Sequence, residues 1–266
     1  MLRICQMFVF LSCTVLSADE IENVLSLPAG EMSASVQKAP MPELGESRIG
    51  QILNRYYRKG LGGPENWGKI LSLKLSGTLK TQQGALQLKV FRKKPEFIKT
   101  ILFDDSAQTS RIRGYDGKLA WQQKAGADTP EVMAGAEARR FIHRAPFGSY
   151  LLYPFAEGKR IRLIDTVPVE GKICHQVRVE LDTGYRVDYF IDIRSYLEIQ
   201  VVHSDQLNST LSSVIYKDYA RASGIPVAKK VKRFEQGEWV STLKIHEVKV
   251  NSGMMPWMFH MSRSQQ

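Results

Sequence analysis

The sequence predicts a mainly β protein in which about a dozen antiparallel strands form one sheet, with an amphipathic helix packed against it. Two observations carry this prediction. Residues Ala85–Gln123 alternate apolar and polar side chains in short runs separated by turn residues, and the pattern resumes at Arg160 and continues to Val250. Short polar connections favour antiparallel neighbours. A sheet with so many strands must curl or close.

A helix is predicted to begin after Ser47, a good N-cap residue, and to end just before Gly60. Basic Arg58 and Lys59 fall in its last turn, where positive charge is favoured. Its apolar residues recur at helical spacing and must cover another surface. They are Ile49, Ile52, Leu53, Tyr56 and Tyr57.

The strands follow in order, each bounded by turn residues. We expect them at 70–80, 85–92, 97–103, 109–113, 118–123, 160–167, 172–181, 185–193, 196–204, 211–219, 228–234 and 239–250. In the last strand the apolar phase slips after Ile245, because Val248 and Val250 fall on the other face, and a β-bulge there would restore their burial. The one long interruption, Ala134–Tyr150, is expected to hold a short helix.

The chain start indicates three segments. Arg3, the apolar run Met7–Leu16 and small residues before Asp19 are typical of a secretory signal peptide, so we expect a signal peptide at 1–18. The apolar run is shorter than the roughly 20 residues of a membrane span. Lipid modification of Cys13 stays open as an alternative. Residues 19–46 are predicted to be an acidic, largely disordered linker, and 47–266 a single domain.

The formal net charge of +10 restricts the partners. A basic chain suggests nucleic acid, but an export signal argues against that partner. An anionic membrane surface or an acidic protein suits an exported basic protein better. We therefore expect no nucleic-acid binding.

Catalytic signals are weak. Cys174 stands beside His175, but neighbouring residues of a strand point to opposite faces, so the two side chains cannot pair, and Cys174 is expected to be a half-buried strand residue. The histidines are scattered without metal-ligand spacing. We expect no metal, no cofactor and no catalysis.

A set of short motifs resembles the LolA family of periplasmic lipoprotein carriers. A strand ends at Lys94-Pro95, and Asp116-Gly117-Lys118 with Trp121 forms a hairpin similar to the family's. Further matches follow in the family's order and extend the resemblance over residues 47–261. They are Tyr189-Phe190-Ile191-Asp192, Leu197-Glu198-Ile199, Tyr216-Lys217-Asp218-Tyr219, Gly224-Ile225-Pro226 and the strand from Lys244 to Asn251.

The resemblance implies a mainly β (α+β) fold: a curved antiparallel half-open β-barrel of about 11–12 strands, with helices plugging the concave hydrophobic face. It implies an exported periplasmic monomer that binds acyl chains of a lipoprotein or lipid and assists transfer to the outer membrane. Inner-membrane donor and outer-membrane acceptor proteins would be its partners. The alternatives are an envelope lipid or stress sensor, or a scaffold, on the same fold that contacts a regulatory partner, and an unrecognised hydrolase.

Strand alternation and the two helices select candidate residues for the hydrophobic cavity. The cavity candidates are Ile52, Tyr56, Leu86, Leu88, Val90, Ile101, Phe103, Trp121, Phe141, Ile142, Tyr189 and Ile191.

The resemblance also implies a latch between the sheet and the helical lid. In the family, an Arg before the strand-breaking Pro bonds to the lid. Here Lys94 precedes Pro95 and Arg92 stands two residues before Lys94, so both are candidates for this lid latch. Lysine lacks the planar fork of arginine.

Overall fold

The computed structural model describes residues 46–151 and 159–262. The expected signal peptide with Cys13 and the expected linker, apart from residue 46, lie outside the described residues.

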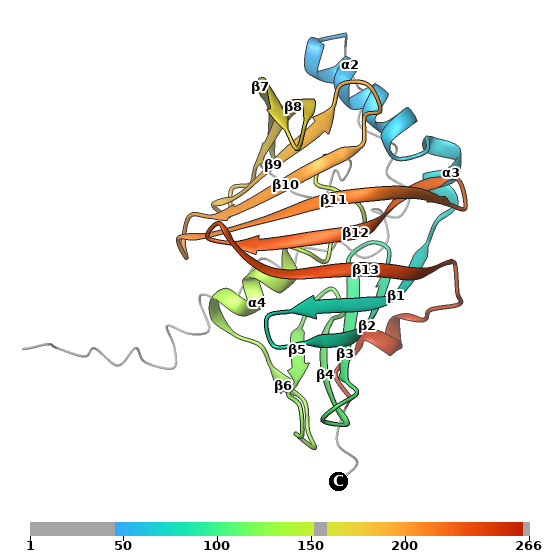
Figure 1. Cartoon of the computed structure of the whole chain (residues 1–266), viewed down its shortest axis with the longest axis vertical. Helices are drawn as coiled ribbons and strands as arrows, with labels where there is room; N and C mark the ends of the chain where they lie inside the picture. The colour runs from blue at the N-terminus through green and yellow to red at the C-terminus, as the bar shows by residue number, and fades with distance from the viewer. Residues whose placement is uncertain (1–45, 152–158, 263–266) are drawn as a thin grey trace, which may run out of the picture. The chain divides into compact units, whose positions relative to one another are not determined.

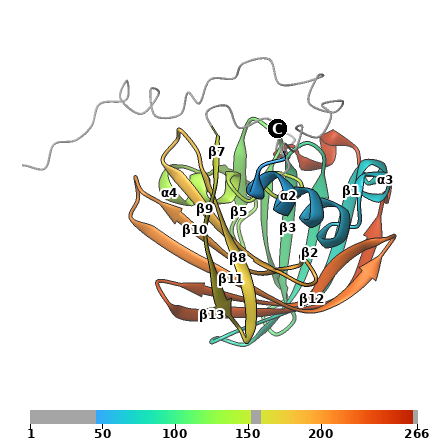
Figure 2. The same ribbon diagram turned by 90° about the horizontal axis from the view of Figure 1, so that it is seen from above.

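The described residues form one 13-stranded antiparallel sheet in the order β6-β5-β4-β3-β2-β1-β13-β12-β11-β10-β9-β8-β7. The sheet curves around helices α2 and α4 (Figures 1 and 2) and is open, because within the described residues β6 and β7 are edges that do not pair with each other. This is the expected curved half-open barrel. The strands are β1 (Ser72–Thr81), β2 (Ala85–Lys93), β3 (Phe97–Asp104), β4 (Thr109–Tyr115), β5 (Ala120–Gln123), β6 (Glu131–Val132), β7 (Arg160–Val169), β8 (Lys172–Glu180), β9 (Tyr185–Asp192), β10 (Glu198–Asp205), β11 (Thr210–Ala222), β12 (Ile225–Glu235) and β13 (Glu238–Val250).

Every predicted strand is present, and β6 is the addition. Its two exposed residues are too few to show alternation. The short helix expected between Ala134 and Tyr150 is α4 (Gly135–Ile142), whereas α3 (Pro64–Lys69) and the 3₁₀-helix η3 (Pro256–Phe259) were not predicted.

The first helix begins as expected but ends differently. The Ser47 hydroxyl accepts a hydrogen bond from the Gly50 amide at 3.2 Å, and α2 runs over Arg48–Arg55. The chain then continues as a π-helical segment, η2 (Tyr56–Gly60), so Gly60 lies inside the helical path and not after it. Glycine is required at this position because a Cβ on residue 60 would lie 2.0 Å from the carbonyl oxygen of Tyr196.

The predicted bulge in β13 is confirmed. The register of β13 against β1 shifts where Ser76 pairs with Glu247 and Gly77 with Ile245. The shift returns Val250 to an apolar cluster with Ile70 beside α3.

Helices cover the concave face over separate apolar clusters. Ile52 of α2 and Tyr56 of η2 pack on β8–β10, and under α4, Phe141 packs with Ile98 and Tyr115. A buried ion pair fixes α4 to the sheet, because Arg139 Nε lies 2.8 Å from a carboxylate oxygen of Asp205. Burial opposes ionisation of Asp205, but hydrogen bonds from Asn208 and Arg139 outweigh it and lower the pKa of Asp205.

The convex face is covered near β5 by η3. Trp121 is 2 % exposed, and its indole nitrogen donates a hydrogen bond to the carbonyl of Phe259 at 2.8 Å. Its cross-strand neighbour is Gly114, where an added Cβ would lie 2.3 Å from the indole ring.

Gly114→Ala should therefore lower the free energy of unfolding by about 1–3 kcal/mol, because the buried indole must move. Urea unfolding checks this. The matched control is Gly68→Ala in α3, where an added Cβ meets nothing within 4 Å. Equal stability of the two variants would contradict the packing described for Trp121.

Candidate ligand-binding face

The concave face carries a row of apolar side chains that the helices leave half-buried. Leu86 pairs with Leu79, Leu79 with Leu243, and Leu243 with Val231, directly opposite one another across β2, β1, β13 and β12. A second row adds Leu88 and Leu102. Together these six half-buried residues, Leu79, Leu86, Leu88, Leu102, Val231 and Leu243, are called the aliphatic strip.

Alternation places the aliphatic strip on the side of the helices. Val90, two residues after Leu88 on β2, packs against the cluster that includes Phe141 of α4. Residues of one strand that are separated by two share a face. The strip therefore lies on the concave face.

The structure divides the twelve cavity candidates between two faces. Leu86 and Leu88 belong to the aliphatic strip. Seven others lie in or against the clusters beneath the helices: Ile52, Tyr56, Tyr189 and Ile191 under α2, and Val90, Phe141 and Ile142 at α4.

The remaining three, Ile101, Phe103 and Trp121, lie on the convex face. On β3, Ile98 packs under α4, so Ile101 and Phe103 point the opposite way. Trp121 pairs across from Gly114 and contacts η3. Strand β3 carries apolar residues on both faces, so alternation could not decide its orientation. A single cavity lined by all twelve residues is therefore not what the chain forms.

A separate apolar pocket of about 400 Å³ lies on the convex face beside η3. Ile101 and Phe91 of the sheet line it together with residues of the chain end, among them Met254 and Met258. Trp257 at its edge is 67 % exposed. Strand alternation does not extend to the chain-end residues and so did not point to them; the cluster of methionines beside Trp257 was the available signal.

Buried polar contacts join α2 and η2 to the sheet. The Tyr56 hydroxyl donates to the carboxylate of Glu198 and lies 3.1 Å from the Ser149 hydroxyl oxygen. Burial raises the pKa of Glu198, and the hydrogen bond from Tyr56 offsets part of that rise. The Tyr189 hydroxyl accepts from the Tyr150 amide at 3.0 Å. These partners explain why Tyr56 and Tyr189 can be buried.

The two latch candidates bind different helical elements. Arg92 Nη2 donates to the backbone carbonyl of Arg144 at 2.8 Å and also reaches the carbonyls of Ala145 and Pro146, directly after α4. Lys94 Nζ donates to the carbonyl of Trp67 in α3 at 2.8 Å. Both residues thus bind helical elements other than α2, the expected lid with Ile52, and a latch role for either stays a prediction.

Cys174 and His175 lie on opposite faces, as expected, since Cys174 pairs with Asp192 and His175 with Ile191. Cys174 is fully buried, not half-buried. Burial and the nearby Asp192 carboxylate raise the pKa of the thiol to about 11. The unreactive thiol form therefore prevails at neutral pH.

Two further histidines lie near the concave face but carry no charge at neutral pH. His143 stacks on Tyr185 with 3.7 Å between ring centroids, and Tyr185 also neighbours His203. Burial lowers the pKa of each histidine to about 3. Among the described residues no group of three or more His, Cys, Asp and Glu could hold a metal ion.

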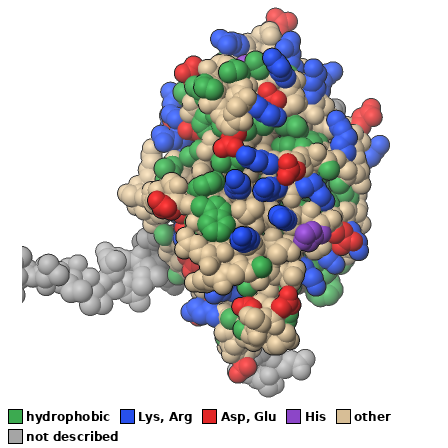
Figure 3. All heavy atoms as spheres, in the orientation of Figure 1, with side chains coloured by type: hydrophobic (Ala, Val, Ile, Leu, Met, Phe, Trp, Pro, Cys, Tyr) green, Lys and Arg blue, Asp and Glu red, His purple; other side chains and the backbone are tan. Residues whose placement is uncertain are grey.

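The convex face is basic over β11–β13. Lys217 pairs with Lys230, and Lys230 with Lys244, so three lysines form a row across three strands. Figure 3 shows Lys and Arg side chains gathered over the middle of one face. Like charges directly opposite each other destabilise a sheet, and an ion pair between Lys217 and Glu170 at 2.6 Å offsets part of this repulsion.

The chain folds as a half-open antiparallel barrel whose concave face offers apolar surface beside helices. Comparison with solved structures identifies the fold as LolA-like. A LolA superfamily protein from Nitrosomonas europaea is 12 % identical with a TM-score of 0.54, over 79 % of this chain and 96 % of that chain. A DUF1329 family protein from Desulfovibrio piger is 11 % identical with a TM-score of 0.54, over the same shares.

A domain named for outer membrane lipoprotein sorting, from Vibrio parahaemolyticus, is 12 % identical with a TM-score of 0.52 over 77 % of this chain and 93 % of that chain. No family model and no curated protein sequence matches. In the described part of the chain, no helix is long and apolar enough to cross a membrane.

Arg92→Ala should loosen the segment after α4. A hydrogen bond from a charged donor contributes about 1.5–3 kcal/mol. Amide hydrogen exchange at residues 143–147 should therefore quicken by roughly tenfold or more. The control is Lys89→Ala, an exposed residue on the same strand. Unchanged exchange in Arg92→Ala would show that Arg92 does not hold this segment.

Glu96, in the turn between β2 and β3, should make stability fall with rising pH. Burial raises its pKa from 4.5 to about 7, so the folded state favours the protonated form. Ionisation costs stability as pH rises from 4.5 through 7, and the cost is constant above that.

Glu96→Gln lacks this cost. Urea unfolding should show equal stability of variant and wild type at pH 4 and an advantage of roughly 2–3 kcal/mol for the variant at pH 8. A difference that does not change with pH would contradict the burial of this carboxyl.

Proposed function

We propose that the protein is an exported periplasmic carrier that holds the acyl chains of a lipoprotein or lipid on its concave face and assists their transfer to the outer membrane. The observation that carries this proposal is the aliphatic strip: contiguous, half-buried and flanked by helices. Binding and release are the whole activity, and no reaction is required.

The energetics of the strip suit an acyl ligand. Each methylene removed from water contributes about 0.8 kcal/mol. A chain lying across β2, β1, β13 and β12 would cover Leu86, Leu79, Leu243 and Val231 in turn. Such contact needs no hydrogen bonds from the ligand, so it accepts chains of different structure.

The sequence pattern of residues 1–18 supports export, and the LolA-like fold supports a role in lipoprotein sorting. Transfer requires a donor at the inner membrane and an acceptor at the outer membrane. The row of Lys217, Lys230 and Lys244 on the convex face suits docking to anionic lipid headgroups, with the concave face left free.

Arg92 is our candidate for the latch. Its bonds to the carbonyls after α4 hold the end of that helix over β2, beside the strip. Breaking them would let α4 move away and admit a ligand.

An acyl fluorophore displaced by fatty acid tests the proposal. Leu88→Asp should weaken probe binding by about tenfold or more, because a carboxylate would replace apolar contact. Native mass spectrometry of the purified protein should show acyl species bound to the wild type.

Ile101→Asp is the matched control, since Ile101 is half-buried one strand away on the convex face. Both variants should keep the wild-type circular dichroism spectrum. Loss of binding in Ile101→Asp alone would show that the ligand binds in the pocket beside η3 and not on the aliphatic strip. A protein that is isolated empty and ignores the probe would overturn carriage and point to a protein partner.

A further inference from the structure

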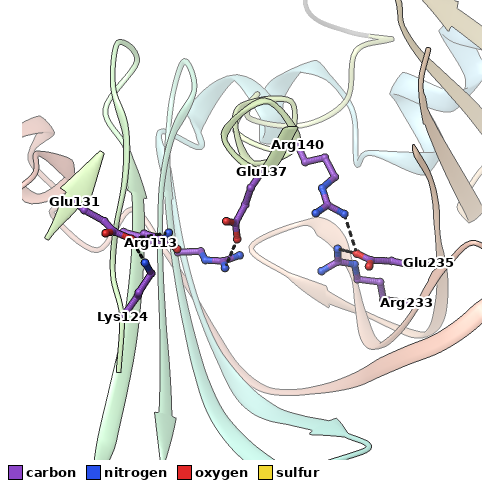
Figure 4. Close-up of polar contacts among 8 residues, drawn as sticks. Arg113, Lys124, Glu131, Glu137, Arg140, Arg233 and Glu235 are labelled. Atoms are coloured by element: carbon purple, nitrogen blue, oxygen red, sulfur yellow. Dashed lines mark hydrogen bonds and ion pairs between the residues drawn. The ribbon is translucent and has the colours of Figure 1, made fainter. Parts of the chain in front are cut away.

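An arginine cluster stands beside the aliphatic strip, between α4 and the sheet. Arg113 comes from β4, Arg233 from β12, and Arg140 and Arg144 from the end of α4 and the residues after it. Figure 4 shows Arg113, Arg140 and Arg233 around the space beneath α4, with Glu137 and Glu235 among them.

The cluster holds more cations than anions. Arg113 Nη2 lies 2.5 Å from a Glu137 oxygen, and Arg140 Nη1 lies 3.4 Å from a Glu235 oxygen. Arg233 contacts the same oxygen of Glu235. In the described part of the chain, one carboxylate thus serves two of these guanidinium groups.

The guanidinium groups repel one another. Burial, together with the positive charges of Arg233 and Arg140, lowers the pKa of Arg144 to about 10. Burial also lowers the pKa of Arg233, and Arg140 and Arg113 add to that effect. Bringing like charges together in a partly desolvated place costs free energy that a bound anion would recover.

Hydrogen-bonding capacity remains in the cluster. The Nε atoms of Arg113 and Arg233 are buried and have no acceptor among the described residues. The side chains of Arg113, Arg140 and Arg233 are still 30 %, 33 % and 30 % exposed, so a solute can reach them. One planar guanidinium group can bind two oxygens of a phosphate or carboxylate through two parallel hydrogen bonds.

The cluster adjoins the apolar surface. Arg233 follows Val231 of the strip by two residues on the same face of β12. Arg113 pairs with Thr100 of β3. Leu102 of the strip follows Thr100 by two residues and lies on the same face of that strand. A ligand with its chain on the strip could therefore place its head among the arginines.

We propose that the concave face selects anionic amphiphiles, with Arg113, Arg140, Arg144 and Arg233 holding a phosphate or carboxylate head while the aliphatic strip holds the chain. This rests on the proposed function and adds the chemical class of the ligand. The same oxyanion chemistry could come from free phosphate, and the test separates the two sources.

Titration of the full chain with dodecyl phosphate, dodecyl maltoside and inorganic phosphate, each below micelle formation, tests this. The first two share a chain and differ in head charge. Dodecyl phosphate should bind at least about tenfold more tightly than the maltoside, and its affinity should fall with added salt. Inorganic phosphate should compete only weakly, because it lacks the chain.

Variants assign the effect to the cluster. Arg144→Gln and Arg233→Gln should each weaken dodecyl phosphate binding by about tenfold and change maltoside binding by less than about twofold. Arg144→Lys, which keeps the charge without the fork, should lose less. Arg160→Gln is the control, because Arg160 is an exposed arginine of edge strand β7 and its neighbour Ile161 is the residue that packs on the concave side. Circular dichroism and melting temperature confirm folding of each variant.

The failures are distinguishable. If neither amphiphile binds, the proposed carriage itself fails. If both bind equally, carriage stands and head selection is overturned. If inorganic phosphate binds as tightly as dodecyl phosphate, the cluster is an anion site unconnected with the strip, which also overturns the inference.

Discussion

The helical cover of the concave face is the constraint on which the rest of the structure depends. An open sheet of thirteen strands exposes one curved apolar surface to water unless something lies across it. Helix α2 and η2 cover one end through Tyr56 and its bond to Glu198, and α4 covers another region through Arg139 and Asp205. The aliphatic strip remains between them, half-buried because the cover is incomplete.

The same cover sets the electrostatics of the two faces. On the convex side, the lysine side chains are in contact with solvent. Salt screens their charges there, and the side chains are flexible. On the concave side, α4 brings Arg140 and Arg144 over Arg233 of the sheet, where partial burial strengthens repulsion between them. The two faces therefore differ in the charges they present: lysines on the convex side, and partly buried arginines beside the aliphatic strip on the concave side.

Movement of α4 would therefore change several properties at once. Arg92 binds backbone carbonyls of the segment after this helix, Arg139 ties the helix to Asp205, and Arg140 reaches Glu235. The positions of the arginines relative to the aliphatic strip therefore depend on this one element of the fold.

Local patterns were sufficient for the strands, the Ser47 cap and even the bulge in β13, since each depends on spacing along the chain. They could not place Ile101, Phe103 and Trp121, because β3 is apolar on both faces and the face is chosen by what packs there: α4 on one side and η3 on the other. The arginine cluster was equally hidden, since Arg113 and Arg233 are 120 positions apart in the numbering and meet only when the sheet curves beneath α4. The sequence by itself determined the twelve longer strands, their order and the helices α2 and α4. Only the tertiary structure decided which faces and charges come together, because that depends on contacts between residues distant in the chain.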